Sequence, residues 1–514
     1  MKIFLKILIP ILTGIIMIIF LASAISKPQA ASNYYVDSIS GDDNNNGLNP
    51  NTAWKTLDKV NSNVFKPGDS ILFKANCSWT GQLKPKGSGN SEKQIAIGMY
   101  AYRSFPRNSR NKPHIEGNGV YATVLLENAE YWTISNLNVS NHVQTTGIAL
   151  RNGICVMAKP TGITHRIIIQ DCEVHDVDGD YRRAVGMYKN SGIRVTFPGT
   201  STKDNRYDEV LIQRNFVHDV KTNGIYVVSE ADALHETFYT NVRVANNTVI
   251  RTGADGAIIS HCISPVVEFN QILDAGYYGN YLTTSWIAGL WQDNNSGITI
   301  FQNNEVARTR AFFGDGQAFD TDWGSGGTSI YQYNYTHENE GGFYLNCAHI
   351  RPKADYVKTI LRYNISVNDD DFIICHDRPD LVEVYNNVFY KSAGHLDPGD
   401  SPSYKFWNNI FNFTSEPNWG KGDFSNNCYF PVAKNSADTN GISAKPGFVR
   451  PGFMGNGMRE GEKLIDYYKL QANSPCINAG MIIQDNGTKD FWGNPLYTGL
   501  PDIGAMEYID APAK

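Results

Sequence analysis

The sequence predicts an all-β protein in which short strands coil upward as a solenoid. Two observations predict this architecture. A short apolar run followed by Asn, any residue and an aliphatic or similar residue recurs along the chain. The asparagines in this position are Asn215, Asn247, Asn270, Asn304, Asn334, Asn364, Asn386, Asn408 and Asn426, and Leu137 and Cys172 occupy it in two earlier copies. The copies lie 18 to 43 residues apart, a range typical of solenoid repeats, which must stack to bury their apolar faces.

Alternating apolar residues inside the repeats predict the strands. Val210 and Ile212 alternate before the Asn of one repeat, and Phe343 and Leu345 alternate after the Asn of a later one. Such alternation is typical of strands with one buried face. Two or three strands per turn, joined at polar corners, make a coil of parallel strands. Asn suits a corner because it accepts the left-handed backbone conformation and can hydrogen-bond to its stacked copy.

The first 31 residues predict a secretory signal peptide. Lys2 and Lys6 precede an apolar run from Ile7 to Ala24, and a short stretch then ends at Ala31. Cleavage after Ala24 or Ala31 fits this pattern, and an uncleaved membrane anchor is the competing interpretation. We therefore expect a secreted, extracellular protein.

Charge and cysteine content exclude several classes of partner. Removing residues 1–31 removes three lysines and no acidic residue, so the formal net charge changes from −6 to −9. A mildly acidic chain argues against binding to nucleic acid or to an anionic membrane. The eight cysteines show no paired CxxC or zinc spacing. Several of them lie inside the repeats, where we expect small buried residues rather than disulfides: Cys172, Cys262, Cys347 and Cys375.

Three parts follow the predicted signal peptide. Residues 32–120 are expected to form an N-terminal cap and the first turn, residues 121–430 the repeats, and residues 431–514 a C-terminal closing segment. The cap is expected to contain a short amphipathic helix from Trp54 to Val60 and a strand from Ser70 to Phe73. A cap is needed because the end of a solenoid offers unpaired backbone groups.

Repeat lengths locate the expected binding surface. The last regular repeats take about 22 residues per turn, so any excess measures loop inserted at the corners. The excess is 13, 21, 10, 1, 12, 8 and 8 residues over the copies from Leu137 to Asn364, and then zero. Long loops on a rigid stack are where binding residues concentrate. We therefore expect a groove across the middle repeats.

One insert, residues 314–324, carries a group of acidic residues. It contains Asp315, Asp320 and Asp322, and Trp323 follows the last of them. Asp315 stands between two glycines, which would let it bend over the site of the other two carboxyl groups. Trp323 offers an apolar face to a sugar ring.

Strand geometry predicts how two of these acids lie. If Phe319 and Thr321 face inward, Asp320 and Asp322 project from the same outer face, roughly 6.5 to 7 Å apart at their Cα atoms. The side chains could then reach the carboxyl separation of a retaining or of an inverting glycosidase.

Further candidates follow in the next repeats. Glu338 is a fourth candidate for catalysis. Close carboxyl groups raise one pKa and keep the other low, which suits an acid and a nucleophile or base in one site. We assign Asp320 or Asp322 as nucleophile or base. The acid is then Asp315 or Glu338. The residues expected to bind substrate are Trp291, Trp323, His337, Tyr344, Asn346 and His376, and no residue is assigned as a metal ligand.

Glu338 and His337 also fit a purely structural interpretation. A polar residue stands four positions after most of the anchor residues, namely at Asp176, Asp219, Arg251, Asp274, Arg308, Glu338 and Asn368. His175, His218 and His337 occupy the preceding position. On this interpretation Glu338 is one rung of a polar edge, and each histidine is a stacked corner residue rather than a base.

Turn-rich segments at both ends of the chain form a recognisable pattern. They are Tyr34–Asp37, Gly41–Asp43, Gly47–Pro50, Thr52–Leu57, Lys86–Gly89 and Asp502–Gly504. The chain thereby resembles, over nearly its whole mature length, secreted right-handed parallel β-helix proteins that act on carbohydrates. Such proteins include polysaccharide lyases, glycoside hydrolases and members with no assigned reaction. Locally, Asp315 and Asp322 are similar to the two nearby aspartates of family 136 glycoside hydrolases, the lacto-N-biosidase type.

A polysaccharide lyase that cleaves a uronate polymer by β-elimination is the main alternative to a glycoside hydrolase. Asp176, Asp178 and Asp180 would then collect Ca²⁺. Candidates for the base or the substrate clamp are Arg182, Arg183, Lys189, Arg351 and Lys353. The excess of carboxylates over basic groups at residues 315–340 disfavours a polyanionic substrate, which favours hydrolysis.

A non-catalytic glycan-binding surface protein is the third interpretation. It would keep Trp286, Trp291, Trp323 and Tyr344 as platforms and would tolerate loss of the acids. A hydrolase would require no cofactor, whereas a lyase would require calcium. In each case we expect an oligo- or polysaccharide as partner and a monomeric protein.

Overall fold

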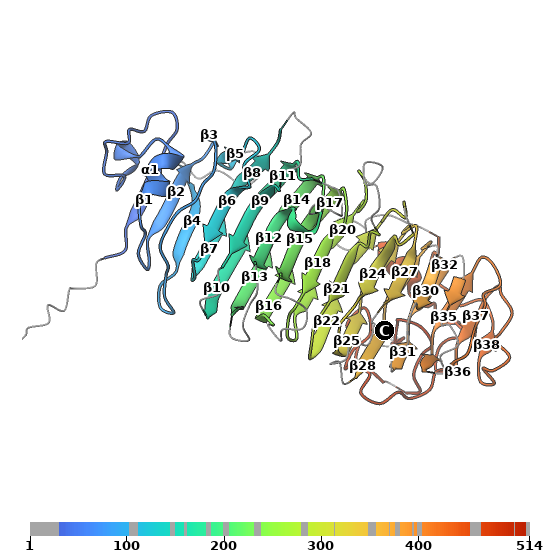
Figure 1. Ribbon diagram of the computed structural model, residues 1–514. Helices are drawn as coiled ribbons and strands as arrows, with labels where there is room; N and C mark the ends of the chain where they lie inside the picture. The colour runs from blue at the N-terminus through green and yellow to red at the C-terminus, as the bar shows by residue number, and fades with distance from the viewer. Residues whose placement is uncertain are drawn as a thin grey trace, which may run out of the picture.

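The chain is a right-handed parallel β-helix, as predicted. The computed structural model describes residues 30–101, 111–143, 150–158, 162–180, 187–198, 205–230, 238–278, 286–312, 314–347, 356–369, 371–375, 381–392, 395–397, 403–452, 464–497 and 499–509. Figure 1 shows an elongated stack of strands that runs from the blue N-terminal end to the orange C-terminal end. Among the described residues, no helix combines the length and apolar character needed to cross a membrane.

Three parallel sheets build the stack, and within the described residues they contain 14, 14 and 10 strands. The first sheet consists of β1 (Asn33–Val36), β2 (Ser70–Lys74), β4 (Ile95–Tyr100), β7 (Trp132–Ser135), β10 (Ile163–Gln170), β13 (Arg206–Gln213), β16 (Thr240–Ala245), β19 (Val266–Glu268), β22 (Ile298–Gln302), β25 (Gly327–Gln332), β28 (Val357–Arg362), β31 (Leu381–Tyr385), β34 (Tyr404–Trp407) and β36 (Asp423–Ser425). The second sheet consists of β3 (Ser78–Thr80), β5 (His114–Glu116), β8 (Asn138–Asn141), β11 (Glu173–Val177), β14 (Phe216–Val220), β17 (Thr248–Thr252), β20 (Gln271–Leu273), β23 (Glu305–Ala307), β26 (Tyr335–His337), β29 (Ile365–Val367), β32 (Val388–Ser392), β35 (Ile410–Phe413), β37 (Cys428–Tyr429) and β38 (Ile442–Ser443). The third sheet consists of β6 (Ala122–Glu127), β9 (Asn152–Met157), β12 (Ser191–Phe197), β15 (Asn223–Ser229), β18 (Ala257–Ser260), β21 (Leu290–Asp293), β24 (Gln317–Thr321), β27 (Gly342–Asn346), β30 (Asp371–Cys375) and β33 (His395–Asp397).

Each turn of the coil passes through the first, second and third sheets in that order. The corner between the first two sheets is short, since β10 ends at Gln170 and β11 begins at Glu173. The corners before and after the third sheet vary in length, and between β11 and β12 the chain runs from Val177 to Ser191. The inserted residues therefore flank the third sheet. We call its two sides the leading edge, where its strands begin, and the trailing edge, where they end.

Columns of aliphatic side chains fill the interior of the coil. Val210 and Ile212 are buried and pair in register with Ile167 and Ile169 of the preceding turn, and with Val242 and Val244 of the next. Each buried side chain of this kind contributes about 1.5 to 3 kcal/mol of transfer free energy. The stack is thus held by repetition of the alternation seen in the sequence.

A ladder of asparagines lines the corner between the first and second sheets. The side chain of Asn215 donates to Oδ1 of Asn247 at 3.0 Å and to the backbone carbonyl of Ile169 at 2.9 Å. The same pattern repeats upward through Asn270, Asn304 and beyond. Because every rung is buried and satisfied, the ladder fixes the vertical register of the turns.

The structure corrects the predicted corner in two ways. The left-handed conformation belongs to the residue before the ladder Asn, for example Arg214 with φ of 53°. In the last three repeats the ladder residues are Asn387, Asn409 and Asn427 rather than Asn386, Asn408 and Asn426. An Asn-Asn pair fits either register in the sequence, and only the stacking distinguishes the two positions.

The displaced asparagines have a different task. Asn386 donates to the carbonyls of Asp502 and Gly504, and Asn408 donates to that of Met481. The C-terminal segment, which includes the short 3-10 helix η5 (Leu464–Tyr468), is thereby bound along this corner.

The N-terminal part contains the expected helix in a slightly shifted position. Helix α1 (Leu57–Ser62) buries Leu57 and Val60, and the Thr56 side chain caps its first turn by accepting from the Lys59 N–H. A short 3-10 helix, η1 (Pro50–Thr52), precedes it. Cys172 and Cys262 are buried free thiols as predicted, Cys347 is partly exposed, and the side chain of Cys375 lies outside the described part.

Candidate active site

The outer face of the third sheet changes character along the stack. Successive strands place Arg194, Tyr226, Ile258, Trp291, Asp320 and Leu345 in one register column on this face. Tyr226, Ile258 and Trp291 pack in an apolar cluster separate from the interior core, and Tyr188 of the 3-10 helix η3 (Met187–Lys189) packs against it. Asp320 continues this column directly after Trp291, so a carboxyl group stands where the preceding rungs are apolar.

Asp320 faces outward, as the sequence predicted. Its neighbours Phe319 and Thr321 face the interior: Phe319 belongs to the core, and the Thr321 hydroxyl lies 2.8 Å from the Tyr331 hydroxyl. Asp320 is only 5% exposed, and its Oδ1 has no hydrogen-bond partner among the described residues. Burial raises its pKa well above the ordinary value, and neighbouring aspartates raise it further.

Four other carboxyl groups act on Asp320 in this way: Asp322, Asp315, Asp255 and Asp293, in decreasing order of effect. Asp315 and Asp322 are partly exposed, at the leading and trailing edges of β24 respectively. Asp320 lies between them along the strand. The structure therefore brings together three of the four aspartates and glutamates predicted as catalytic.

Sequence reasoning missed two members of this cluster. Asp293 follows Gln292 at the end of β21, and Gln292 is the register partner of Thr321, which Asp322 follows in the next turn. Asp255 precedes β18 at the leading edge. Aligning the strands of successive repeats would have placed Asp293 beside Asp322. Nothing in the sequence marks Asp255 except its position between Ala254 and Gly256.

Asp255 is buried and has an incomplete hydrogen-bond shell. Its Oδ1 accepts from the Ala288 N–H at 3.0 Å, whereas its Oδ2 has no partner among the described residues. Burial raises its pKa to about 7. The Ala288 N–H and the neighbouring Trp291 oppose this rise, and Asp315 adds to it.

The aromatic candidates have different outcomes. Trp323 is 46% exposed beside Asp322, and Trp286, at the leading edge, is 52% exposed. A Cβ added to Gly314 would contact the Trp286 ring at 3.7 Å, so this ring lies close to the residue before Asp315. Trp291 is buried in the outer apolar cluster, where it forms the floor beside Asp320 rather than an open platform.

Tyr344 and Asn346 were wrongly predicted to face substrate. The Tyr344 hydroxyl donates to Thr321 at 3.0 Å and to Thr359 at 3.3 Å inside the coil, and Asn346 pairs in register with Thr321. The alternation of Phe343 with Leu345 suggested the opposite phase. The consecutive residues Phe343 and Tyr344 both belong to the interior core, so the alternation changes phase at this point of β27.

Glu338 and His337 belong to the second sheet. His337 is fully buried, with Nδ1 3.0 Å from Glu338 and Nε2 3.3 Å from Glu305. The His337 contact lowers the pKa of Glu338, which is unfavourable for a general acid. Glu338 has a φ of 57°, like Asp176 and the other residues of the predicted polar edge. Both therefore match the structural interpretation. His376 lies outside the described residues.

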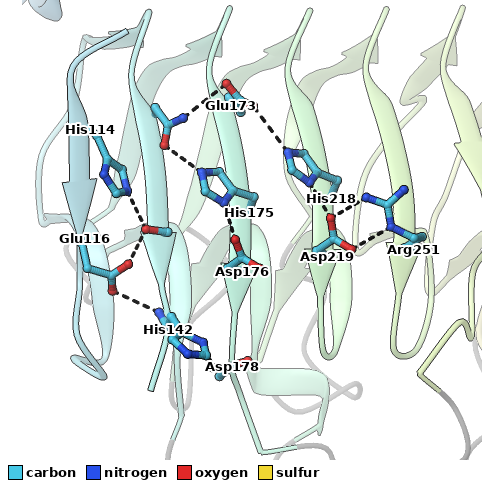
Figure 2. Close-up of polar contacts among 12 residues, drawn as sticks. His114, Glu116, His142, Glu173, His175, Asp176, Asp178, His218, Asp219 and Arg251 are labelled. Atoms are coloured by element: carbon cyan, nitrogen blue, oxygen red, sulfur yellow. Dashed lines mark hydrogen bonds and ion pairs between the residues drawn. The ribbon is translucent and has the colours of Figure 1, made fainter. Parts of the chain in front are cut away.

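The second sheet repeats this arrangement in its earlier turns. Figure 2 shows His175 and His218 on the neighbouring strands β11 and β14, and His114 two strands before His175 on β5, with carboxylates between and below these histidines. His218 lies 2.7 Å from Asp219, which in turn binds Arg251. The His175 and His218 rings stack at 5.1 Å. Burial alone would lower the pKa of His218, but Glu173 and Asp219 raise it above its ordinary value.

The residues proposed for a lyase do not come together as a metal site. Asp176 binds His175, and Asp178 binds His142 at 2.6 Å and Lys221 at 3.2 Å. Asp180 is buried apart from this surface. Within the described ranges, no three His, Cys, Asp or Glu side chains are arranged to hold a metal ion. Arg182, Arg183, Arg351 and Lys353 lie outside those ranges, and Lys189 ends η3 beside Glu230 at 3.9 Å.

Comparison with known proteins finds one curated relative and several solved structures that are similar to this chain. No protein-family model matches the chain. A lacto-N-biosidase of Bifidobacterium longum subsp. longum is 29% identical over 603 residues, covering 93% of this chain and 36% of that protein. This chain thus spans about a third of the length of that relative.

Solved structures show the same fold. The native structure of a GH136 lacto-N-biosidase from Eubacterium ramulus has a TM-score of 0.59 at 23% identity, covering 76% of this chain and 68% of that one. A complex of XylC with xylose has a TM-score of 0.52 at 11% identity, covering 93% of this chain and 98% of that one.

Proposed function

We propose that the protein is a secreted glycoside hydrolase whose reaction centre is the aspartate cluster on the outer face of the third sheet. The observation that carries the proposal is the position of Asp320. It is buried with an elevated pKa between Asp315 and Asp322, which reach solvent. Carboxyl groups held close together in different environments divide into proton donors and carboxylates. The similarity to a lacto-N-biosidase supports the same reaction class.

The exposure of the three aspartates and the raised pKa of Asp320 suggest a role for each of them. Asp322 is the nucleophile or the base, because it is partly exposed and adjoins a buried carboxyl group. Asp315 is the acid that protonates the leaving oxygen. Asp320 was expected to be a nucleophile or base, but a carboxyl group kept neutral by burial does not suit that role. It acts instead beneath Asp322, where it can donate a hydrogen bond to that carboxylate.

Substrate contacts are proposed for the exposed tryptophans at the two edges. Trp323 adjoins Asp322, and Trp286 lies close to the residue before Asp315, so a sugar chain that crosses the carboxyl groups would meet an aromatic face on each side. A lacto-N-bioside is the first substrate to test, since the similar protein from Bifidobacterium longum is a lacto-N-biosidase. We expect the enzyme to act as a monomer.

The test is a panel of oligo- and polysaccharides, including a lacto-N-bioside, scored for new reducing ends and for ultraviolet absorbance, with and without a chelator. Hydrolysis releases reducing ends without absorbance and is insensitive to the chelator. Elimination leaves an unsaturated uronate that absorbs, and absorbance abolished by the chelator would replace the hydrolase by the lyase. Binding without any product would support the glycan-binding protein.

A further inference from the structure

Two buried aspartates at the leading edge of the third sheet have the same setting but opposite hydrogen bonding. Asp369 is fully enclosed: Oδ1 accepts from the backbone and side-chain amides of Asn339, and Oδ2 accepts from Thr336 and Ser366. Asp255 accepts on Oδ1 from the Ala288 N–H, and the neighbouring Trp291 side chain also lowers its pKa, but its Oδ2 has no partner in hydrogen-bond geometry among the described residues. Leaving a buried carboxyl oxygen without a partner is costly, so it is informative where a structure retains one.

The stacking of the leading edge places Asp255 beneath Asp315. The Gly256 N–H bonds to the Ala288 carbonyl at 3.4 Å, and the Gly316 N–H bonds to the Ile287 carbonyl at 2.7 Å. The segment at 315–316 therefore stands two turns above Asp255 on the same side of the coil. Asp255 and Asp315 influence each other electrostatically, and Trp291 closes the space beside them.

We propose that Asp255 is a positioning residue that keeps a proton within an Asp255–Asp315 pair, so that Asp315 remains able to act as the acid. The inference rests on the proposed hydrolase function. It also gives the two edges a common plan, since each partly exposed aspartate adjoins a buried one: Asp315 with Asp255, and Asp322 with Asp320.

The proton balance of the step is simple. Asp315 gives its proton to the glycosidic oxygen as the bond between that oxygen and the anomeric carbon breaks. The anomeric carbon bonds either to Asp322, in which case Asp315 takes a proton from the water that hydrolyses this intermediate, or to a water whose proton goes to Asp322, in which case the pair regains its proton from solvent after the reaction. Two carboxyl groups that repel each other electrostatically lose their second proton at a higher pH than an isolated one would. The other titratable groups that face Asp255 are Asp320 on β24 and Tyr226 on β15, and burial raises the pKa of both, which favours their neutral forms.

The decisive experiment compares Asp255→Asn with the parent protein and with Asp369→Asn, across pH 4 to 9, on the substrate identified by the panel. Asn preserves the oxygen that accepts from Ala288 but cannot hold the second proton. We expect the alkaline limb of kcat/KM to move down by about one pH unit or more in Asp255→Asn. In Asp369→Asn the alkaline limb of kcat/KM should stay at the pH of the parent protein, even if the overall rate changes. A limb at the same pH in all three proteins would overturn the inference.

A second measurement needs no substrate and therefore separates this inference from the proposed function. Asp255 has a raised pKa in the folded protein, so its ionisation destabilises the fold as pH rises from about 4 to about 7. The melting temperature of Asp255→Asn relative to the parent should therefore rise by about 2 °C or more over this interval. A constant difference would show that Asp255 holds no proton and would sink the inference even if hydrolysis is confirmed. If Asp255→Asn does not fold, Asp255→Ser serves in both measurements.

Discussion

The outer faces of the second and third sheets both carry columns of ionisable side chains, yet they treat charge in opposite ways. On the second sheet, carboxylates meet cations: Arg251 lowers the pKa of Asp219, with a further contribution from His218. On the third sheet, burial and like charges raise the pKa values of Asp320 and Asp255. Paired carboxylates in the second sheet stabilise the stack. Burial of Asp320 and Asp255 among like charges makes their ionised forms destabilising, and perturbed carboxyl groups of this kind are common at functional sites.

The contrast extends along the whole coil. Arg308 binds Asp274 at 2.8 Å beside the second sheet, as Arg251 binds Asp219 two turns earlier in the coil. The only basic group placed in the outward column of the third sheet within the described residues, Arg194, pairs with Glu230 several turns before the aspartate cluster. A single backbone plan thus supports a face of paired charges and the face to which we assign the proposed reaction centre.

The largest expected effect comes from removing the acid of the third sheet. Asp315→Asn should lower kcat on a natural glycoside by about 10³-fold, because general acid catalysis contributes 10² to 10⁴-fold. On an aryl glycoside with a good leaving group the loss should be much smaller, since that oxygen departs without a proton. Initial rates on both substrates measure this. Equal losses on the two would show that Asp315 is not the acid.

A comparable change on the second sheet should affect stability rather than chemistry. His337→Ala leaves buried Glu305 with one partner fewer and should destabilise the fold by about 3 kcal/mol. Denaturant unfolding gives the free energy, and kcat at a temperature where both proteins are folded should remain close to that of the parent. A strong loss of kcat without destabilisation would place His337 in the reaction centre after all.

Trp323→Ala tests the trailing edge of the third sheet. Loss of one stacking face should raise KM about tenfold, equivalent to about 1.4 kcal/mol, with kcat little changed. Phe269→Ala is the matched control, because Phe269 is similarly exposed but lies at the corner of the first and second sheets. The comparison fails if both substitutions change KM equally.

The smallest effect concerns how the stability contributed by the ion pairs of the second sheet depends on pH. His218 has a raised pKa, so its stabilisation is complete below about pH 6.5 and is lost as pH rises through the folded value. Asp219 has a lowered pKa, so its contribution is present above about pH 4 and is lost as pH falls. The stability difference between the parent and His218→Gln should therefore shrink between pH 6 and pH 9, and should not exceed about 1 kcal/mol. A difference that grows with pH would contradict the pairing.

The fold could be predicted from the sequence because its cause is local. Alternation sets the strands, and Asn-x-aliphatic corners recur often enough to count turns. The errors arose where two neighbouring residues were equally suited to the ladder position, as at Asn386 and Asn387, or where the alternation changed phase, as at Tyr344. These outcomes depend on contacts between turns, which a single repeat does not contain.

The candidate site was predictable only in part for a related reason. Asp315, Asp320 and Asp322 lie in one insert and could be found together. Asp255 joins them through stacking across two turns, so its position depends on the lengths of the intervening corners. Glu338 looked equally acidic in the sequence, but its contact with His337 assigns it to the scaffold.

The most direct test of the contrast is a pair of substitutions assayed on one substrate, Asp322→Asn on the third sheet and Glu338→Gln on the second. We expect Asp322→Asn to lose at least about 10³-fold in the rate of reducing-end release while still binding the substrate, and Glu338→Gln to retain a rate within about threefold of the parent. A fully active Asp322→Asn, or an inactive but folded Glu338→Gln, would contradict the assignment of the reaction centre to the third sheet.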